Sequence, residues 1–161
     1  MKYRLLLLDA NVVIYLNELG LWEQFINQCD VTLTETVVQE VMSYDLQPDI
    51  RSGKVRCVSA SLKSIETFKN QLGPAYLDRM DPGEAESLAY LIESRESWLL
   101  SSGDEIVYKT LGLLNRAEQG ISLEELLQKV GMGRTSLEVQ YTRQFRLNVT
   151  RKGQMDHVEG F

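Results

Sequence analysis

The chain of 161 residues has the length of one ordinary domain and is too short for two domains with separate cores. Hydrophobic residues make up 43% and charged residues 25%, an average globular composition that argues against a disordered or fibrous protein. The net charge of −6 at pH 7 excludes a protein that holds nucleic acid by bulk positive charge. An acidic active site remains compatible with it.

Histidine and cysteine are scarce in the chain. The one histidine is His157, and the two cysteines, Cys29 and Cys57, form no CxxC pair. This argues against a histidine-based triad, a zinc site of the usual spacing and a disulfide scaffold. The apolar run 5–8 ends at Asp9, well short of the roughly 7–15 apolar residues of a secretory signal or the about 20 of a membrane helix. We therefore expect a cytoplasmic protein without a membrane contact.

Short apolar runs alternate with helical patterns along the chain. The run at 3–8 shows no polar alternation, which is typical of a strand buried on both faces of a parallel sheet. Such alternation predicts a three-layer α/β/α sandwich with a small, mostly parallel sheet, with residues 1–114 as its core and 115–161 as a C-terminal helical extension of the same domain. Further strands are expected at 31–34, 55–58 and 98–100, and helices at 11–19, 21–29, 34–43, 61–72, 81–94, 105–114, 122–131 and 134–148, with a turn near 48–53 and a polar tail at the end.

Polar side chains follow two of the predicted strands. Asp9 and Asn11 come after the first strand, and Ser102 and Asp104 come after the strand at 98–100. Because ligands of open α/β sheets bind beyond the carboxyl ends of the strands, we expect these side chains to face one crevice. Asp9 and Asp104 are also suited to capping the helices that follow them, and position alone does not decide between the two roles.

Three glutamates on two helices are further candidates. Glu40 lies past the first turn of the helix at 34–43, where a surface position is the ordinary alternative. Glu84 follows Asp81 by three residues, so a capping box accounts for it, but it also flanks the buried stripe of its helix. Glu86, two residues later, points about 200° away from Glu84 and cannot serve the same site equally well.

These acids together indicate a metal site. Carboxylates packed closely raise one another's pKa unless a cation neutralises them. Hard oxygen ligands select Mg²⁺ or Mn²⁺, and such a site can orient a water for attack on a phosphodiester without any histidine.

At four segments the sequence resembles the PIN-domain nuclease family. The segments are 5–11, 34–41, 82–89 and 99–104, and the resemblance covers roughly residues 3–114. It implies a parallel sheet flanked by helices, an acidic Mg²⁺ or Mn²⁺ site and endoribonuclease activity that leaves a 5′-phosphate and a 3′-hydroxyl. Many members are the toxin of a toxin–antitoxin pair.

The partners expected from the resemblance are an RNA substrate and an antitoxin protein. We further expect a homodimer.

Individual residues can be assigned candidate roles as well. Arg51, Lys54, Arg56 and Arg79 are candidates to hold the RNA backbone, as is the segment 131–161, with five Lys/Arg against three Asp/Glu. The implied catalytic acids and metal ligands are Asp9, Glu40, Glu84 and Asp104, with Glu86 as a further possible ligand and Asn11 and Ser102 in support.

Two departures from the family pattern leave alternatives open. The last loop can be aligned one residue earlier, which places Gly103 at an acidic position and indicates a weakened site. After Leu114 the usual final strand is not evident. Both features suit a non-catalytic interaction module whose last helices bind a partner. A phosphohydrolase with Asp9 as nucleophile is a weaker alternative, because Asn11 stands where such enzymes need a second aspartate.

Overall fold

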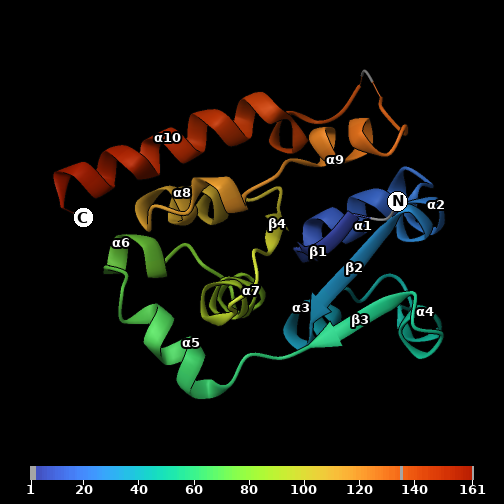
Figure 1. The fold of residues 1–161 in the computed structure, drawn as a ribbon, viewed down its shortest axis with the longest axis horizontal. Coiled ribbons are helices and arrows are strands. Elements are labelled where there is room, and N and C mark those ends of the chain that lie inside the picture. Colours follow the sequence, from blue (N-terminus) through green and yellow to red (C-terminus); the bar gives the residue numbers. More distant parts are fainter. Residues whose placement is uncertain (1–2, 135, 161) are drawn as a thin grey trace.

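Four parallel strands form the centre of the fold in the computed structural model, which describes residues 3–134 and 136–160 (Figure 1). The strand order is β3-β2-β1-β4, and every pairing is parallel. This confirms the prediction of a small parallel sheet, and it places the carboxyl ends of all four strands at one edge. The strands are β1 (Tyr3–Leu8), β2 (Cys29–Thr34), β3 (Val55–Val58) and β4 (Leu99–Ser101).

Helices connect the strands and extend the chain beyond them. They are α1 (Ala10–Glu18), α2 (Trp22–Gln28), α3 (Glu35–Glu40), α4 (Gln47–Arg51), α5 (Leu62–Lys69), α6 (Pro74–Leu77), α7 (Pro82–Glu93), α8 (Glu105–Leu113), α9 (Leu123–Lys129) and α10 (Arg143–Glu159), with single 3₁₀ turns η1 (Ala117–Gln119) and η2 (Val139–Tyr141). Among the described residues, no helix is both long and apolar enough to cross a membrane.

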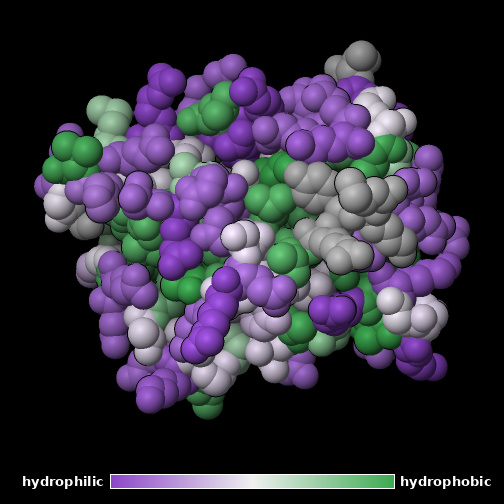
Figure 2. All heavy atoms as spheres, in the orientation of Figure 1, coloured by the Kyte–Doolittle hydropathy of each residue, from purple (hydrophilic) through white to green (hydrophobic). Residues whose placement is uncertain are grey.

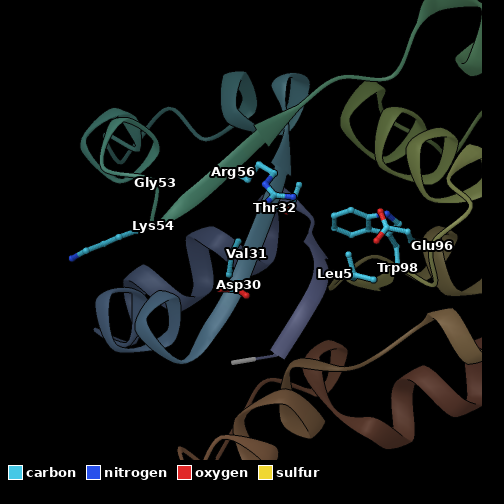
Figure 3. Close-up of a pocket in the computed structure, with 9 residues that line it drawn as sticks. All are labelled: Leu5, Asp30, Val31, Thr32, Gly53, Lys54, Arg56, Glu96 and Trp98. Atoms are coloured by element: carbon cyan, nitrogen blue, oxygen red, sulfur yellow. The ribbon is translucent and has the colours of Figure 1, made fainter. Parts of the chain in front are cut away.

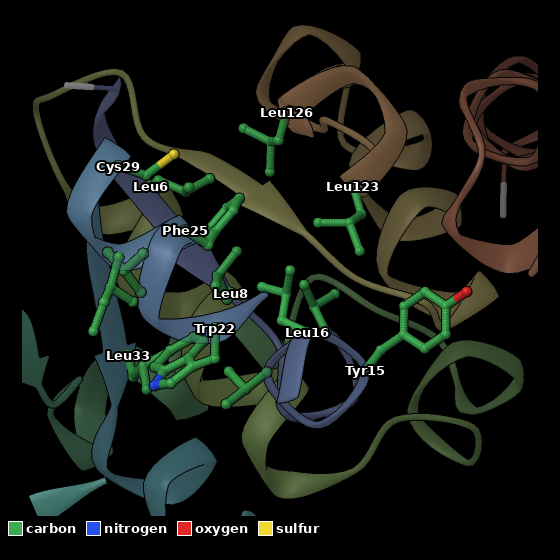
Figure 4. Close-up of a cluster of buried hydrophobic side chains, with 14 of the residues drawn as sticks. Leu6, Leu8, Tyr15, Leu16, Trp22, Phe25, Cys29, Leu33, Leu123 and Leu126 are labelled. Atoms are coloured by element: carbon green, nitrogen blue, oxygen red, sulfur yellow. The ribbon is translucent and has the colours of Figure 1, made fainter. Parts of the chain in front are cut away.

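The strand β1 divides the core between the two faces of the sheet. Leu6 and Leu8 pack into one hydrophobic cluster, whereas Leu7 packs into the other, because successive side chains of a strand point to opposite faces. The first cluster includes side chains of α1, α2 and α9 (Figure 4), and the second includes α5, α7, α8 and α10. The predicted three-layer α/β/α sandwich is therefore confirmed. Hydrophilic residues cover most of the face that Figure 2 shows.

The C-terminal region differs from the prediction. The last helix begins at Arg143 rather than 134, because the Thr142 hydroxyl caps it by accepting a hydrogen bond from the Phe145 amide at 3.3 Å. It continues to Glu159 through residues expected to be a polar tail. Within the described residues no strand follows β4, as expected, although Gly120 forms a single parallel bridge to Leu100 beside it.

The helices α8 and α10 lie side by side, and their backbones approach closely at two glycines (Figure 1). A Cβ on Gly153 would collide with the Lys109 carbonyl, and one on Gly112 would collide with the Thr150 carbonyl. The absence of side chains at both positions therefore allows the backbones to approach closely, which fixes α10 against the rest of the domain.

Replacing Gly153 with alanine should destabilise the protein. Alanine favours a helix by about 1 kcal/mol over glycine, but the methyl group meets immovable backbone, and overpacking costs typically about 1–3 kcal/mol or more. We expect a net loss in the free energy of unfolding, measured by urea denaturation. The control is Gly133→Ala, where the nearest side-chain atom would be 3.7 Å from the new Cβ. An unchanged urea midpoint for Gly153→Ala would contradict the close packing of these helices.

Candidate functional site

The end of β1 and the loop after β4 are joined by hydrogen bonds at the carboxyl edge of the sheet. The Ser102 hydroxyl donates to Asp9 Oδ2 at 2.7 Å, and the Gly103 amide donates to Asn11 Oδ1 at 2.8 Å. The Asp9 amide in turn donates to the Ser101 carbonyl at 3.0 Å. The structure thus brings together Asp9, Asn11 and Ser102, although 90 or more residues separate the two loops in the chain.

A buried tyrosine fixes the backbone of the second loop. The Tyr108 hydroxyl accepts a hydrogen bond from the Ser102 amide at 3.0 Å and lies 2.8 Å from the Ser102 carbonyl oxygen. The Ser102 hydroxyl also accepts from the Asp104 amide at 2.9 Å. Asp104 Oδ1 caps α8 by accepting from the Ile106 amide at 3.3 Å. The loop is therefore rigidly held with Asp104 at its end.

The start of α7 supplies two further acids. Glu84 Oε1 accepts from the Asp81 amide at 3.0 Å, while Asp81 Oδ1 accepts from the Glu84 amide at 2.9 Å, which confirms the predicted capping box. Glu84 Oε2 is buried and has no hydrogen-bond partner. An orphaned buried carboxylate oxygen is costly, and it is the group that a cation would satisfy.

Glu40 reaches the same helix start from α3. Its carboxylate lies against Gly83, at the place a Cβ would occupy, so a side chain at 83 would displace it. The Gly83 amide is near enough to lower the pKa of Glu40, but Glu40 Oε1 is buried and makes no hydrogen bond. Packing therefore favours glycine at position 83, because a side chain there would occupy the space of the Glu40 carboxylate.

The acids influence one another electrostatically. The pKa of Asp9 is raised from 3.8 to about 7, mainly by burial and further by the charges of Asp81 and Glu40. The hydrogen bond from Ser102 acts in the opposite direction and lowers this pKa. Burial and then the charge of Asp9 raise the pKa of Glu84 well above its ordinary value, and Asp104 contributes. Burial and the charge of Asp81 likewise raise the pKa of Glu40. These five acids, Asp9, Glu40, Asp81, Glu84 and Asp104, are called the acidic cluster below.

Asp81 is the member of the cluster that the sequence analysis assigned only to helix capping. Its charge acts on both Asp9 and Glu40, and its side chain is exposed, so the cluster reaches the surface there. The signal was present in the sequence, because Asp81 belongs to the segment that carries Glu84. The capping box accounts for Asp81 fully, however, so its residue type and position do not by themselves predict a second role.

Glu86 points away from the acidic cluster. Its two carboxylate oxygens accept hydrogen bonds from the Thr36 amide at 3.0 Å and from the Ala60 amide at 3.1 Å. The side chain is 5% exposed and connects α7 to the start of α3 and to the loop after β3. Both oxygens already serve the backbone, so its contribution is to hold α3, the helix that carries Glu40.

The acids do not enclose a ready-made metal site. Within the part of the chain that the structure describes, no three or more Asp, Glu, His or Cys side chains gather closely enough to hold one ion. Capping explains this in part, because it directs one oxygen each of Asp9, Glu84 and Asp104 to a backbone amide. Nevertheless, the donor set suits a hard cation, since all members are carboxylates and two buried oxygens lack partners.

A cavity of about 450 Å³ lies at the opposite edge of the sheet (Figure 3). It is lined by residues at the amino ends of the strands, such as Leu5, Val31 and Arg56, and by Trp98 before β4. Lys54 and Arg56, two of the residues considered for the RNA backbone, therefore lie at the amino edge, whereas the acidic cluster is at the carboxyl edge. Arg79 is exposed and precedes Asp81 of the cluster by two residues in the chain.

Comparisons of the chain with protein-family models, with curated proteins and with solved structures found no match.

The raised pKa of Asp9 predicts a pH dependence of stability in metal-free protein. Between about pH 4 and 7 the unfolded chain releases this proton while the folded chain keeps it, so the free energy of unfolding falls as pH rises. Asp9→Asn removes this dependence. Relative to wild type, the variant should gain up to about 1.4 kcal/mol per pH unit across the window, measured by urea denaturation with a chelator present. Parallel stability curves for the two proteins would contradict the raised pKa.

Glu86→Gln should destabilise the fold. A glutamine can accept with only one side-chain oxygen, so its NH₂ group would face the amide of either Thr36 or Ala60. A buried amide left without an acceptor costs about 1–3 kcal/mol, which urea denaturation resolves. Glu93→Gln, at an exposed position of the same helix, is the control and should change little. Equal stabilities for the two variants would show that Glu86 does not hold α3.

Proposed function

We propose that the chain is a Mg²⁺- or Mn²⁺-dependent endoribonuclease of the PIN-domain type, which hydrolyses RNA phosphodiester bonds. The observation that carries the proposal is Glu84 Oε2, a buried carboxylate oxygen without a partner among other acids. A fold that needed these acids only as helix caps would gain nothing from burying that oxygen among like charges. The parallel sheet with helices on both faces also agrees with the fold that the resemblance implies.

Asp9, Glu84 and Asp104 are the proposed ligands, with Glu40 beside them. Each of the three places one oxygen on a backbone amide at a helix start, which fixes the carboxylate. The second oxygen of Asp9 accepts from Ser102, and the second oxygen of Glu84 is buried without a partner. Asp81 adds negative charge at the exposed rim. The proposal includes a turn of these side chains when a cation binds, because they do not surround a common point in the metal-free fold.

A bound Mg²⁺ or Mn²⁺ would supply the positive charge that neutralises the carboxylates and stabilises the charge developing on a phosphodiester. The chain itself positions the acids. The Ser102 hydroxyl holds Asp9 Oδ2, and Asn11 holds the loop that presents Asp104. Histidine takes no part, since His157 Nδ1 lies 2.8 Å from the Leu113 carbonyl oxygen, at the far end of α8 from Asp104.

The same resemblance supports an antitoxin protein as a partner. The proposal also includes a homodimer, which the C-terminal extension beyond the family pattern suggests, and a cytoplasmic location, which the short apolar run before Asp9 suggests. Arg79 is the basic residue that we assign to the RNA phosphate, because it precedes Asp81 by two residues and is exposed.

Asp9→Asn and Glu84→Gln should abolish RNA cleavage. Each substitution removes a carboxyl group that would ionise when the cation binds, with little change in volume. We therefore expect a loss of at least about 100-fold in the rate with Mn²⁺, from first-order fits to cleavage of a fluorescent single-stranded RNA. The control is Glu66→Gln, an exposed acid on α5. Circular dichroism checks that each variant is folded.

Two outcomes would contradict the proposed function. Cleavage by folded Asp9→Asn at the wild-type rate would place the activity elsewhere. Cation binding without cleavage of any RNA in a randomised pool would favour the alternative of a weakened interaction module, whose C-terminal helices bind a protein partner.

A further inference from the structure

The C-terminal extension reaches the acidic cluster through one aromatic side chain. Tyr141, in the turn η2, is 130 residues from Asn11 in the chain, and its hydroxyl donates a hydrogen bond of 3.3 Å to the Asn11 carbonyl. The ring is buried, with 6% of the residue exposed. The extension therefore contacts the chain directly at Asn11, two residues after Asp9 of the acidic cluster.

The same ring covers the second loop at Gly103. A Cβ on Gly103 would lie 2.6 Å from the ring carbon Cε1 of Tyr141, so the ring occupies the space that a side chain would take. Gly103 stands between Ser102 and Asp104, and its amide donates to Asn11 Oδ1. The two contacts of Tyr141 thus converge on the hydrogen-bonded pair that ties the two loops together.

Tyr141 is itself held firmly by α1. Its ring stacks on that of Tyr15 with centroids 4.0 Å apart and an angle of 8° between the planes. The Tyr15 hydroxyl, which points away from the core cluster (Figure 4), accepts a hydrogen bond of 3.0 Å from the Glu138 amide. Segment 138–141 is therefore anchored at both of its ends, and the Tyr141 ring has a fixed position over Gly103.

We infer that Tyr141 is a positioning residue of the acidic cluster. It acts through Asn11 and Gly103 to keep Asp9 and Asp104 at a fixed separation. The inference concerns loop geometry, and its consequence for metal binding rests on the proposed function. Residues that orient metal ligands without touching the ion typically contribute about 10- to 100-fold to affinity. The extension would then be a part of the site and not only a cover of the sheet.

The test compares Tyr141→Ala and Tyr141→Phe with the control Tyr90→Ala. Tyr90 also forms an aromatic pair, edge-on to Trp98 with centroids 5.4 Å apart, and among the described residues its ring pairs with neither Asn11 nor Gly103. Amide hydrogen exchange of Gly103 and Asp104 reports the loop geometry, and calorimetric titration of Mn²⁺ reports the site. Urea denaturation separates both from global stability.

Tyr141→Ala should speed exchange of the Gly103 amide and weaken Mn²⁺ binding about 10- to 100-fold. Tyr141→Phe keeps the ring and should restore most of both. Tyr90→Ala should leave both unchanged, even where it lowers stability. Unchanged exchange at Gly103 in folded Tyr141→Ala would overturn the inference.

A second comparison covers the case in which Tyr141→Ala does not fold. Gly103→Ala should weaken Mn²⁺ binding, because its methyl group displaces the Tyr141 ring. The double variant with Gly103→Ala and Tyr141→Leu should lose less Mn²⁺ affinity than the sum of the two single losses. Strictly additive effects would overturn the inference. If wild type binds no Mn²⁺, the proposed function fails, and Gly103 exchange in the same proteins still decides the role of Tyr141.

Discussion

The structure depends on the burial of two carboxyl groups, those of Asp9 and Glu84, among other acids at the carboxyl edge of a parallel sheet. Asp9 follows a strand of four leucines and is 3% exposed, so its ionisation has to be supported by donors or by a cation. One hydroxyl and one amide support it, and the neighbouring acids oppose it. Burial first, and the neighbouring acids in addition, therefore raise the pKa of Asp9 and of Glu84.

Helix capping and the acidic cluster use the same residues. Asp9, Asp104 and the pair Asp81 and Glu84 all begin helices, and the cap directs one carboxylate oxygen of each toward backbone amides. Capping and cation binding are therefore not competing explanations. The cap holds each carboxylate in place near the positive end of a helix dipole. The acids of the cluster thus lie at the starts of α1, α7 and α8, apart from Glu40 on α3.

Local signals in the sequence predicted the sheet and the start of α7. The apolar run before Asp9 indicated a buried strand, and the Asp-Pro-Gly-Glu segment specified a capping box that the structure contains. The last helix was misplaced because it buries only Val149, Thr150 and Gly153, so its sequence lacks an apolar period. It is held by close backbone approach to α8, which glycines permit and hydrophobic patterns do not reveal.

The site was predicted less completely than the fold. Strand ends placed Asp9 and Asp104 near one another, since that follows from parallel topology. The direction of Glu86 toward two amides, the second role of Asp81 and the contact of Tyr141 depend on tertiary packing across up to 130 residues. No local pattern encodes such contacts, so they required the three-dimensional structure.

The central claim is that the acidic cluster binds a divalent cation by releasing protons. Calorimetric titration of Mn²⁺ at pH 6.5, in buffers of different ionisation enthalpy, measures both binding and the protons released. The account predicts saturable binding with proton release, because Asp9 with a pKa of about 7 is largely protonated at that pH. Asp9→Asn should lose the part of this release that comes from Asp9, whereas Glu84, whose pKa is also raised, still contributes its proton. Absence of saturable binding by folded wild-type protein would contradict the account.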